Sequence, residues 1–239
     1  SGRMRQHTVL SLKSVTALIC LHAGAMVVLG QWTAPQLVND PSETASKTTK
    51  VAASKNGGFH IVYNSGVLRY KRYTDSLSAG KTLFSPMNFN HYVTESLNGD
   101  IHVVFENWAS GGPEVGWVRS TDGGATFSST VNLSASGGNA KHPHIVPFGM
   151  GSSSEALMSY YRANSKLLYY SRFNGTSWSA EASIGSTSES EYDCVGMAWS
   201  QFNGSVWRTF SPSLTSSRMR NYTGSWGPEI PLPFPSWVV

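Results

Sequence analysis

The chain repeats one short pattern five times, and this repeat limits its possible folds more than any other feature. In each copy a turn leads to an aromatic residue, and an extended segment follows. The aromatic residues are Trp32, Phe84, Phe127, Trp178 and Trp226. Their spacing gives a repeat of about 48 residues, which indicates a fold assembled from similar units rather than one irregular core.

A second pattern has the same period and predicts four strands in each repeat. Segments rich in β-branched and aromatic residues, such as 59–63, follow turns that contain Gly or Ser. Another extended segment lies on either side of each one, as 49–54 and 67–73 do around 59–63. Units of four short strands, repeated roughly every 40 to 55 residues, are typical of propeller blades. We therefore predict an all-β, five-bladed β-propeller.

Both ends of the chain are needed to close such a ring. Residues 15–38 are predicted to supply the outer strands of the closing blade and residues 235–239 its innermost strand, with residues 8–14 as the alternative for that inner place. Residues 1–14 otherwise hold the remnant of an expression tag and an N-terminal arm. On this interpretation residues 1–239 form a single domain.

Residues 15–29 also have a second interpretation. They form an apolar run, and Ala23-Gly24-Ala25 resembles a signal-peptidase site, as in a secretory signal peptide. The protein would then be secreted or periplasmic; if the run forms strands, the sequence does not define a location. The run is interrupted and only about 15 residues long, which is too short for a membrane span.

The charge pattern argues against a nucleic-acid partner. Lys and Arg number 18 against 14 Asp and Glu, and the basic residues form no continuous stripe. The two cysteines, Cys20 and Cys194, are too few for a disulfide framework. We expect a monomer whose partner is a small molecule or a glycan.

Residues 120–127 read Ser-Thr-Asp-Gly-Gly-Ala-Thr-Phe. This stretch resembles the Asp-box, Ser-x-Asp-x-Gly-x-Thr-Phe/Trp, of the sialidase-like and BNR-repeat β-propellers. The resemblance implies a hairpin turn between the third and fourth strands of a blade, on the face away from an active site. It also implies structural roles for Ser120, Asp122, Gly124 and Phe127, in which the Asp side chain holds the turn and the aromatic ring packs between strands.

Histidines are predicted to meet at the entrance of the central channel. In our alignment of the innermost strands, the first positions are Thr49, His91, His144, Asp193 and Ser236. Several imidazoles with a carboxylate suit zinc and leave one position open for a water molecule. Such a water is a hydrolytic nucleophile near neutral pH. We therefore predict a metal-dependent hydrolase with a divalent ion, expected to be zinc, at this entrance.

The ends of the second strands reach the same face, and our alignment places His22, Asn64, Glu106 and Arg162 at matching positions. Glu106 is the predicted general base. The predicted metal ligands are His91, His142, His144 and His22, with Asp193 as the second catalytic carboxylate. His60 and His102 recur at one place in the second strands, so they are predicted to pack and to hydrogen-bond with a neighbouring blade.

The alternative function is carbohydrate binding without catalysis. Aromatic faces stack on sugar rings, and the predicted binding residues are Arg162, Trp108 and Tyr161. A working exo-sialidase is disfavoured, because the resemblance implies six blades and an Arg-Ile-Pro motif that this sequence lacks near its start. The choice between the hydrolase and the lectin-like protein stays open at this point, with the enzyme favoured.

Overall fold

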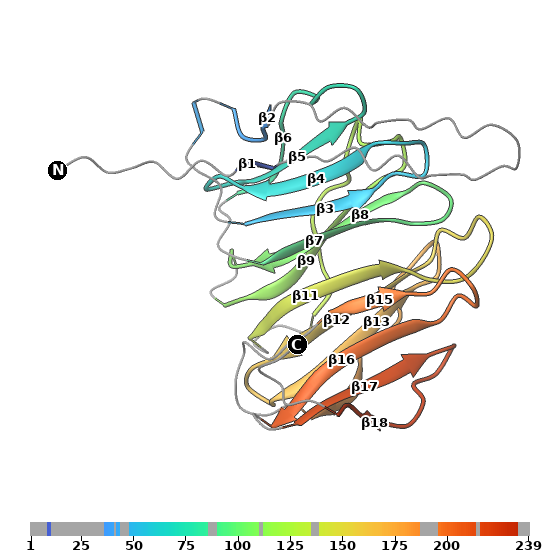
Figure 1. Cartoon of the computed structure of the whole chain (residues 1–239). Helices are drawn as coiled ribbons and strands as arrows, with labels where there is room; N and C mark the ends of the chain where they lie inside the picture. The colour runs from blue at the N-terminus through green and yellow to red at the C-terminus, as the bar shows by residue number, and fades with distance from the viewer. Residues whose placement is uncertain are drawn as a thin grey trace, which may run out of the picture.

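The computed structural model of the protein describes residues 9–10, 36–40, 42–43, 48–85, 90–109, 112–134, 139–186, 196–213 and 216–233. Every regular element in these ranges is a β-strand. The strands form four antiparallel sheets of four strands each and one two-stranded sheet. Figure 1 shows the large sheets following one another in chain order. Within the described ranges, no helix is long and apolar enough to cross a membrane.

The four large sheets are called blades 1 to 4, and each is a meander whose neighbours along the chain pair with each other. Blade 1 holds β3 (Thr49–Ala53), β4 (Phe59–Asn64), β5 (Leu68–Tyr73) and β6 (Lys81–Phe84). Blade 2 holds β7 (His91–Glu95), β8 (Ile101–Asn107), β9 (Glu114–Ser120) and β10 (Val131–Asn132). Blade 3 holds β11 (Ala140–Pro147), β12 (Ala156–Arg162), β13 (Leu167–Phe173) and β14 (Ala182–Ser186). Blade 4 holds β15 (Met197–Trp199), β16 (Val206–Ser213), β17 (Ser216–Tyr222) and β18 (Ile230–Pro231).

The prediction of four strands per repeat is confirmed for these four repeats, and the arrangement is propeller-like. The two-stranded sheet pairs β1 (Val9–Leu10) with β2 (Gln36–Leu37). Residues 36–38 belong to the predicted fifth blade, whereas residues 11–35 and 234–239 lie outside the described residues.

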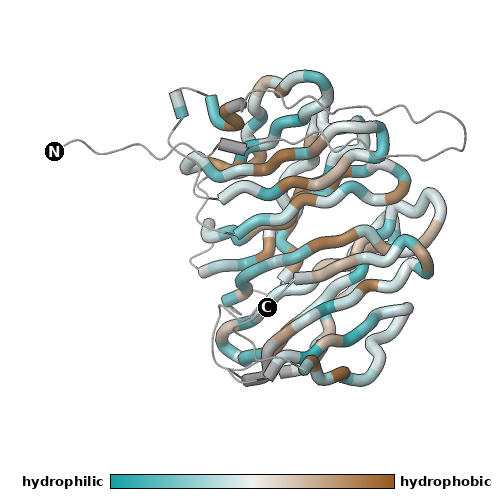
Figure 2. The backbone as a smooth tube through the Cα atoms, viewed as in Figure 1, coloured by the Kyte–Doolittle hydropathy of each residue, from teal (hydrophilic) through white to brown (hydrophobic). Residues whose placement is uncertain are grey.

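The core lies between the faces of neighbouring blades. Along β8 the side chains alternate: Val103 and Phe105 pack in the apolar cluster shared with blade 1, and Val104 packs in the cluster shared with blade 3. All three are fully buried, and each contributes about 1.5 to 3 kcal/mol of hydrophobic stabilisation. Figure 2 shows the apolar residues concentrated along the strands. Because these side chains make the second strand of the blade apolar on both faces, this strand packs against both neighbouring blades and holds them together.

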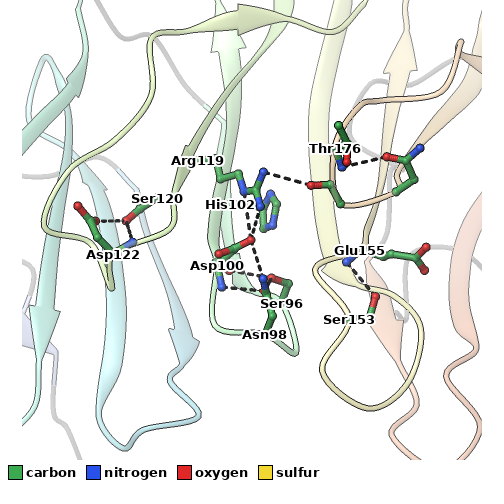
Figure 3. Close-up of polar contacts among 12 residues, drawn as sticks. Ser96, Asn98, Asp100, His102, Arg119, Ser120, Asp122, Ser153, Glu155 and Thr176 are labelled. Atoms are coloured by element: carbon green, nitrogen blue, oxygen red, sulfur yellow. Dashed lines mark hydrogen bonds and ion pairs between the residues drawn. The ribbon is translucent and has the colours of Figure 1, made fainter.

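The turn after β9 is held by short-range hydrogen bonds. Asp122 Oδ1 accepts from the Ser120 hydroxyl at 2.7 Å and from the Thr126 amide at 2.8 Å, and the Gly124 amide donates to Ser120 Oγ at 2.8 Å. The hydrogen bonds from Thr126 and Ser120 hold the pKa of Asp122 well below its ordinary value. Phe127 packs edge-on against Tyr70 of blade 1, with 4.9 Å between ring centroids. Asp122 therefore holds the turn, and Figure 3 shows its contact with Ser120. Its lowered pKa keeps the carboxylate charged.

Two buried histidines occupy equivalent places in β4 and β8. His60 Nε2 lies 2.5 Å from Glu95 Oε2 in blade 2, so it bridges two blades. His102 Nδ1 instead accepts from Trp117 Nε1 at 3.3 Å within its own blade, and its ring packs against Phe173 of blade 3. Both histidines are packing residues between blades.

Candidate functional site

Each blade has two ends with different connections. At the turn end, the first strand turns into the second and the third into the fourth. Here Arg119 forms an ion pair with Asp100 and also donates to the Gly175 carbonyl of blade 3 at 3.3 Å, as Figure 3 shows. At the loop end, the second strand leads to the third and each blade leads to the next. The residues predicted for catalysis, metal binding or sugar binding lie at or near the loop end, as far as the structure describes them.

The strand pairings correct the sequence alignment by one residue in blade 3. The first pair of β4 with β5 is Phe59–Tyr73, and the corresponding pair of β12 with β13 is Ala156–Phe173. Arg162 therefore does not match Asn64 and Glu106, as the alignment of the second strands assumed. Tyr161, and not Arg162, is level with Glu106. Because a shift of one residue exchanges the two faces of a strand, Arg162 lies on the face of blade 3 opposite to that of Tyr161.

The same shift changes which inner-strand residues are level with His144. His144 pairs with Ser159 and is therefore level with Tyr92 and Lys50, not with His91. The His144 and Tyr92 rings lie 3.8 Å apart, and Lys50 Nζ lies 4.4 Å from the centre of the Tyr92 ring. Burial and nearby positive charge hold the pKa of His144 well below its ordinary value, so this imidazole is neutral.

The predicted metal ligands are not brought together within the described residues. His91 is fully buried, with Nε2 3.0 Å from the Val62 carbonyl oxygen and Nδ1 3.5 Å from Thr48 Oγ1, so both ring nitrogens contact blade 1. No group of three His, Cys, Asp or Glu side chains suited to a metal ion occurs in the part of the chain that the structure describes. His22 and Asp193 lie outside that part, and a zinc site that includes them stays a prediction.

Glu106 connects three segments at the loop end of blade 2. Its Oε1 accepts from Asn90 Nδ2 at 2.7 Å and from the His142 amide of β11 at 2.9 Å, while Oε2 accepts from Trp108 Nε1 at 3.4 Å. Its residue exposure is 2%, so these donors replace the water that a carboxylate loses on burial. The buried carboxylate thereby fixes the orientation of the half-buried Trp108.

A second polar cluster extends from Arg162, at the loop end of β12, across the blade to Glu181, which immediately precedes β14. Arg162 Nη2 lies 2.7 Å from both Glu181 oxygens, and its guanidinium carbon lies 4.3 Å from the centre of the Tyr169 ring. Tyr160 also donates a hydrogen bond to Glu181. Burial alone would lower the pKa of Arg162, but contact with the Glu181 carboxylate outweighs it and raises that pKa. The arrangement is a fixed donor–acceptor pair against an aromatic face. We call Tyr160, Arg162, Tyr169 and Glu181 the Arg162 cluster.

The Arg162 cluster lies beside blade 2. Tyr160 packs in the apolar cluster with Val104 and Val115 of that blade, and Arg162, two residues on, shares its face. Ala140, which pairs with Arg162, donates its amide to the Pro113 carbonyl at 2.7 Å. The two polar groups around Glu106 and Arg162 therefore belong to one junction between blades.

Part of this junction could be predicted from the sequence. Arg162, Trp108 and Glu106 were predicted, while Glu181, Tyr169 and Asn90 were missed because their roles depend on pairing between strands. Tyr161, predicted to stack on a sugar, is 3% exposed and packs with Leu168, Ile184 and Phe210. Alternation along β12 was the signal for this difference, since Tyr161 and Arg162 must face opposite sides.

No family model matches the chain, and no curated protein matches it in sequence. Solved structures do share its fold. A protein of unknown function from Dyadobacter fermentans matches with a TM-score of 0.60 and 14% identity over 85% of this chain and 69% of that one. The intramolecular trans-sialidase from Ruminococcus gnavus, in complex with oseltamivir carboxylate, gives 0.56 and 7% over 80% and 71%. A mutant of the Aleuria aurantia lectin, in complex with Fucalpha1-6GlcNAc, gives 0.55 and 12% over 79% and 64%.

These matches define a class of fold. The chain is a β-propeller-like protein whose architecture resembles that of sialidase and lectin structures. It corresponds to between 64% and 71% of the length of the three structures named. At identities of 14% or less, the likeness concerns the fold alone.

Proposed function

We propose that the protein binds carbohydrate, without catalysis, at the junction of blades 2 and 3. The observation that carries this proposal is the Arg162–Glu181 pair held against Tyr169. A guanidinium and a carboxylate side by side offer donors and acceptors to neighbouring sugar hydroxyls. Aromatic rings offer the apolar face on which a sugar ring stacks.

The cluster is also preorganised, which favours binding. Arg162 is fixed by Glu181 and by the Tyr169 ring, so little side-chain entropy remains to be lost when a ligand binds. Its side chain is 14% exposed and that of Glu181 is 22% exposed, so both reach solvent from a largely buried position. Trp108, oriented by Glu106, supplies a further aromatic surface in the same junction.

The fold neighbours support the same class of function without assigning it. One is named a lectin in complex with a fucose-containing disaccharide, and another is named a trans-sialidase. We further propose that the chain belongs to the Asp-box propellers and that a fifth blade closes its ring. The contacts of Ser120 and Asp122 support the first point, and the docking of Val38 and Glu43 on blade 1 supports the second.

Titration calorimetry with Fucα1-6GlcNAc, methyl α-L-fucoside and arabinobiose tests the proposal. We expect at least one of these sugars to bind, and Arg162→Lys to weaken that binding at least tenfold, because a lysine cannot reproduce the planar donor pair. Arg172→Lys is the matched control. Arg172 pairs with Glu155 at 2.7 Å and lies over Phe148, but at the turn end of the same blade. Binding of none of the three sugars, or an equal loss in both variants, contradicts the proposal.

A further inference from the structure

Four Asn-Gly pairs occur in the sequence, and all of them lie in turns at the turn end of a blade. Three of these turns join the first strand of a blade to the second, and one joins β13 to β14. The pairs are Asn56-Gly57, Asn98-Gly99, Asn174-Gly175 and Asn203-Gly204. Asparagine is chemically labile before glycine, because no Cβ keeps the glycine nitrogen away from the side-chain carbonyl carbon. The four pairs share this chemistry and differ in their surroundings.

The asparagine in blade 2 is held on both sides of its carboxamide. Asn98 Oδ1 accepts from the Ser96 hydroxyl at 2.7 Å, and Asn98 Nδ2 donates to Asp100 Oδ2 at 2.9 Å, as Figure 3 shows. A reaction at the side-chain carbon of Asn98 would have to break these hydrogen bonds.

Two further asparagines are held in the same way by the residues that follow them. Asn174 Oδ1 accepts from the amides of Thr176 and Ser177, both at 2.9 Å. Asn203 Oδ1 accepts from the amide of Ser205 at 3.1 Å and from its hydroxyl at 2.7 Å. Contacts of this kind between a side chain and the nearby backbone stabilise a turn and fix the carboxamide in place.

The asparagine in blade 1 differs from these three. Asn56 is exposed, and its backbone amide donates to Ser54 Oγ at 3.4 Å. In the part of the chain that the structure describes, the carboxamide of Asn56 makes no hydrogen bond. Its side-chain carbon is therefore accessible without the loss of any side-chain contact.

The glycines single out the same pair independently. Gly57 is exposed, whereas Gly99 and Gly175 are half-buried and Gly204 is buried. A Cβ on Gly57 would meet no atom within 4 Å, but at each of the other three positions it would meet one at 2.8 Å or less. Open space and solvent around Gly57 admit a base that removes the amide proton and let a leaving group diffuse away.

We propose that Asn56 is a site of spontaneous deamidation. In the closed turn the Gly57 amide donates to the Ser54 carbonyl at 3.0 Å, so the exposed turn opens first. The Gly57 nitrogen then loses its proton to a base in the solvent and attacks Asn56 Cγ, and Nδ2 takes up a proton and leaves as ammonia. Water hydrolyses the cyclic imide at either of its two carbonyl carbons, which gives an aspartyl or an isoaspartyl residue. The steps together consume one water and release one ammonia.

The modification adds a negative charge beside a contact between blades 1 and 2. Lys55, which precedes the modified residue, donates its amide to Glu95 Oε1 at 3.3 Å and its ammonium group to the Asn98 carbonyl. The isoaspartyl product also lengthens the main chain by one carbon at this point. These changes affect the turn end of the molecule, and the inference does not depend on the carbohydrate binding proposed at the loop end.

Peptide mapping by mass spectrometry tests the proposal after the full chain has been incubated in mildly alkaline water labelled with heavy oxygen. The label marks residues that were hydrolysed during the incubation and not during the later digestion. In the folded protein we expect Asn56 to react at least tenfold faster than each of the other three asparagines. In urea the four rates should agree to within about threefold, because unfolding removes the contacts that distinguish them.

Asn56→Gln is the control variant, because its additional methylene group disfavours closure of the imide ring. It should take up no label at position 56 and should leave the other three rates as in wild type. If Asn56 in folded wild type takes up no label, or reacts no faster than the other three, the proposal is wrong. A rate at Asn56 that is equal in mildly acidic and mildly alkaline buffer would also contradict it, since the Gly57 amide must lose its proton.

Discussion

The turn after β9 contains two adjacent glycines, and a side chain is expected to cost more stability at one of them than at the other. Both have positive φ, 69° for Gly123 and 89° for Gly124, but a Cβ on Gly124 would lie 2.2 Å from the Tyr70 hydroxyl. Gly124→Ala is therefore expected to lower the free energy of unfolding by about 2 to 4 kcal/mol, from strain and from overpacking. A Cβ on Gly123 would meet only Arg72 Nη1 at 3.4 Å, so Gly123→Ala is expected to cost about 1 kcal/mol. Urea unfolding measures both, and equal losses would contradict the packing role of Gly124.

The residues whose roles could be predicted from the sequence are those whose partners lie only a few positions away in the chain. Ser120, Asp122 and Thr126 contact one another within a few positions, so a short motif defines their geometry. Arg162 and Glu181 are 19 positions apart and meet only because β13 folds back between them. No spacing in the sequence specifies that contact. The Arg162 cluster was therefore only partly predictable.

At the scale of strands, periodicity predicted the elements well and their register poorly. The segments predicted over 49–54, 59–63 and 67–73 agree with β3, β4 and β5 to within one residue at each end. The alignment of blade 3 was nevertheless shifted by one position, because β12 is apolar on both faces and its pattern does not mark which residue faces which blade. That shift moved Arg162 and His144 to the wrong faces of their strands.

His102, in the second strand of blade 2, is expected to make the stability of the fold sensitive to acid. Burial, and to a lesser degree Arg119, lowers the pKa of His102 to about 4 from 6.5. The unfolded chain therefore binds a proton between these values that the folded chain does not bind. Stability should fall as pH decreases from 6.5 to 4, by about 3 kcal/mol from this residue alone.

His102→Leu tests this sensitivity, since Leu157 holds the equivalent place in blade 3. At pH 7.5 the variant is expected to be less stable by about 1 to 3 kcal/mol, because Trp117 Nε1 loses its acceptor. Its stability should then decline less steeply between pH 6.5 and 4. Urea unfolding across this range measures the slope, and a slope equal to that of wild type would show that His102 does not titrate as described.

At the scale of the whole molecule, the segment before blade 1 is secured to that blade. Val38 packs with Ile61 and Tyr63, and Asp40 pairs with the buried Lys71 at 2.5 Å. These contacts cover the face of blade 1 that a preceding blade would cover in a ring. The repeat length in the sequence predicted the blades. Closure of the ring depends on which face of a blade remains to be covered, and that face is defined only once the sheets have assembled.

Glu43 is the residue that most directly tests this docking. Its side chain is 8% exposed, pairs with Arg69 Nε at 3.1 Å and accepts from the Tyr63 hydroxyl at 3.1 Å. Glu43→Ala is expected to lower the free energy of unfolding by about 1 to 3 kcal/mol, since it leaves the buried Tyr63 hydroxyl without this acceptor. Hydrogen exchange should also accelerate in residues 36–40 and along β4.

Glu229→Ala is the control. Glu229 pairs with Arg218 at the surface of blade 4, where both side chains are more than a third exposed. Loss of the Glu229 side chain should therefore change the free energy of unfolding by less than about 0.5 kcal/mol. If the two variants behave alike, the segment before blade 1 does not stabilise the propeller.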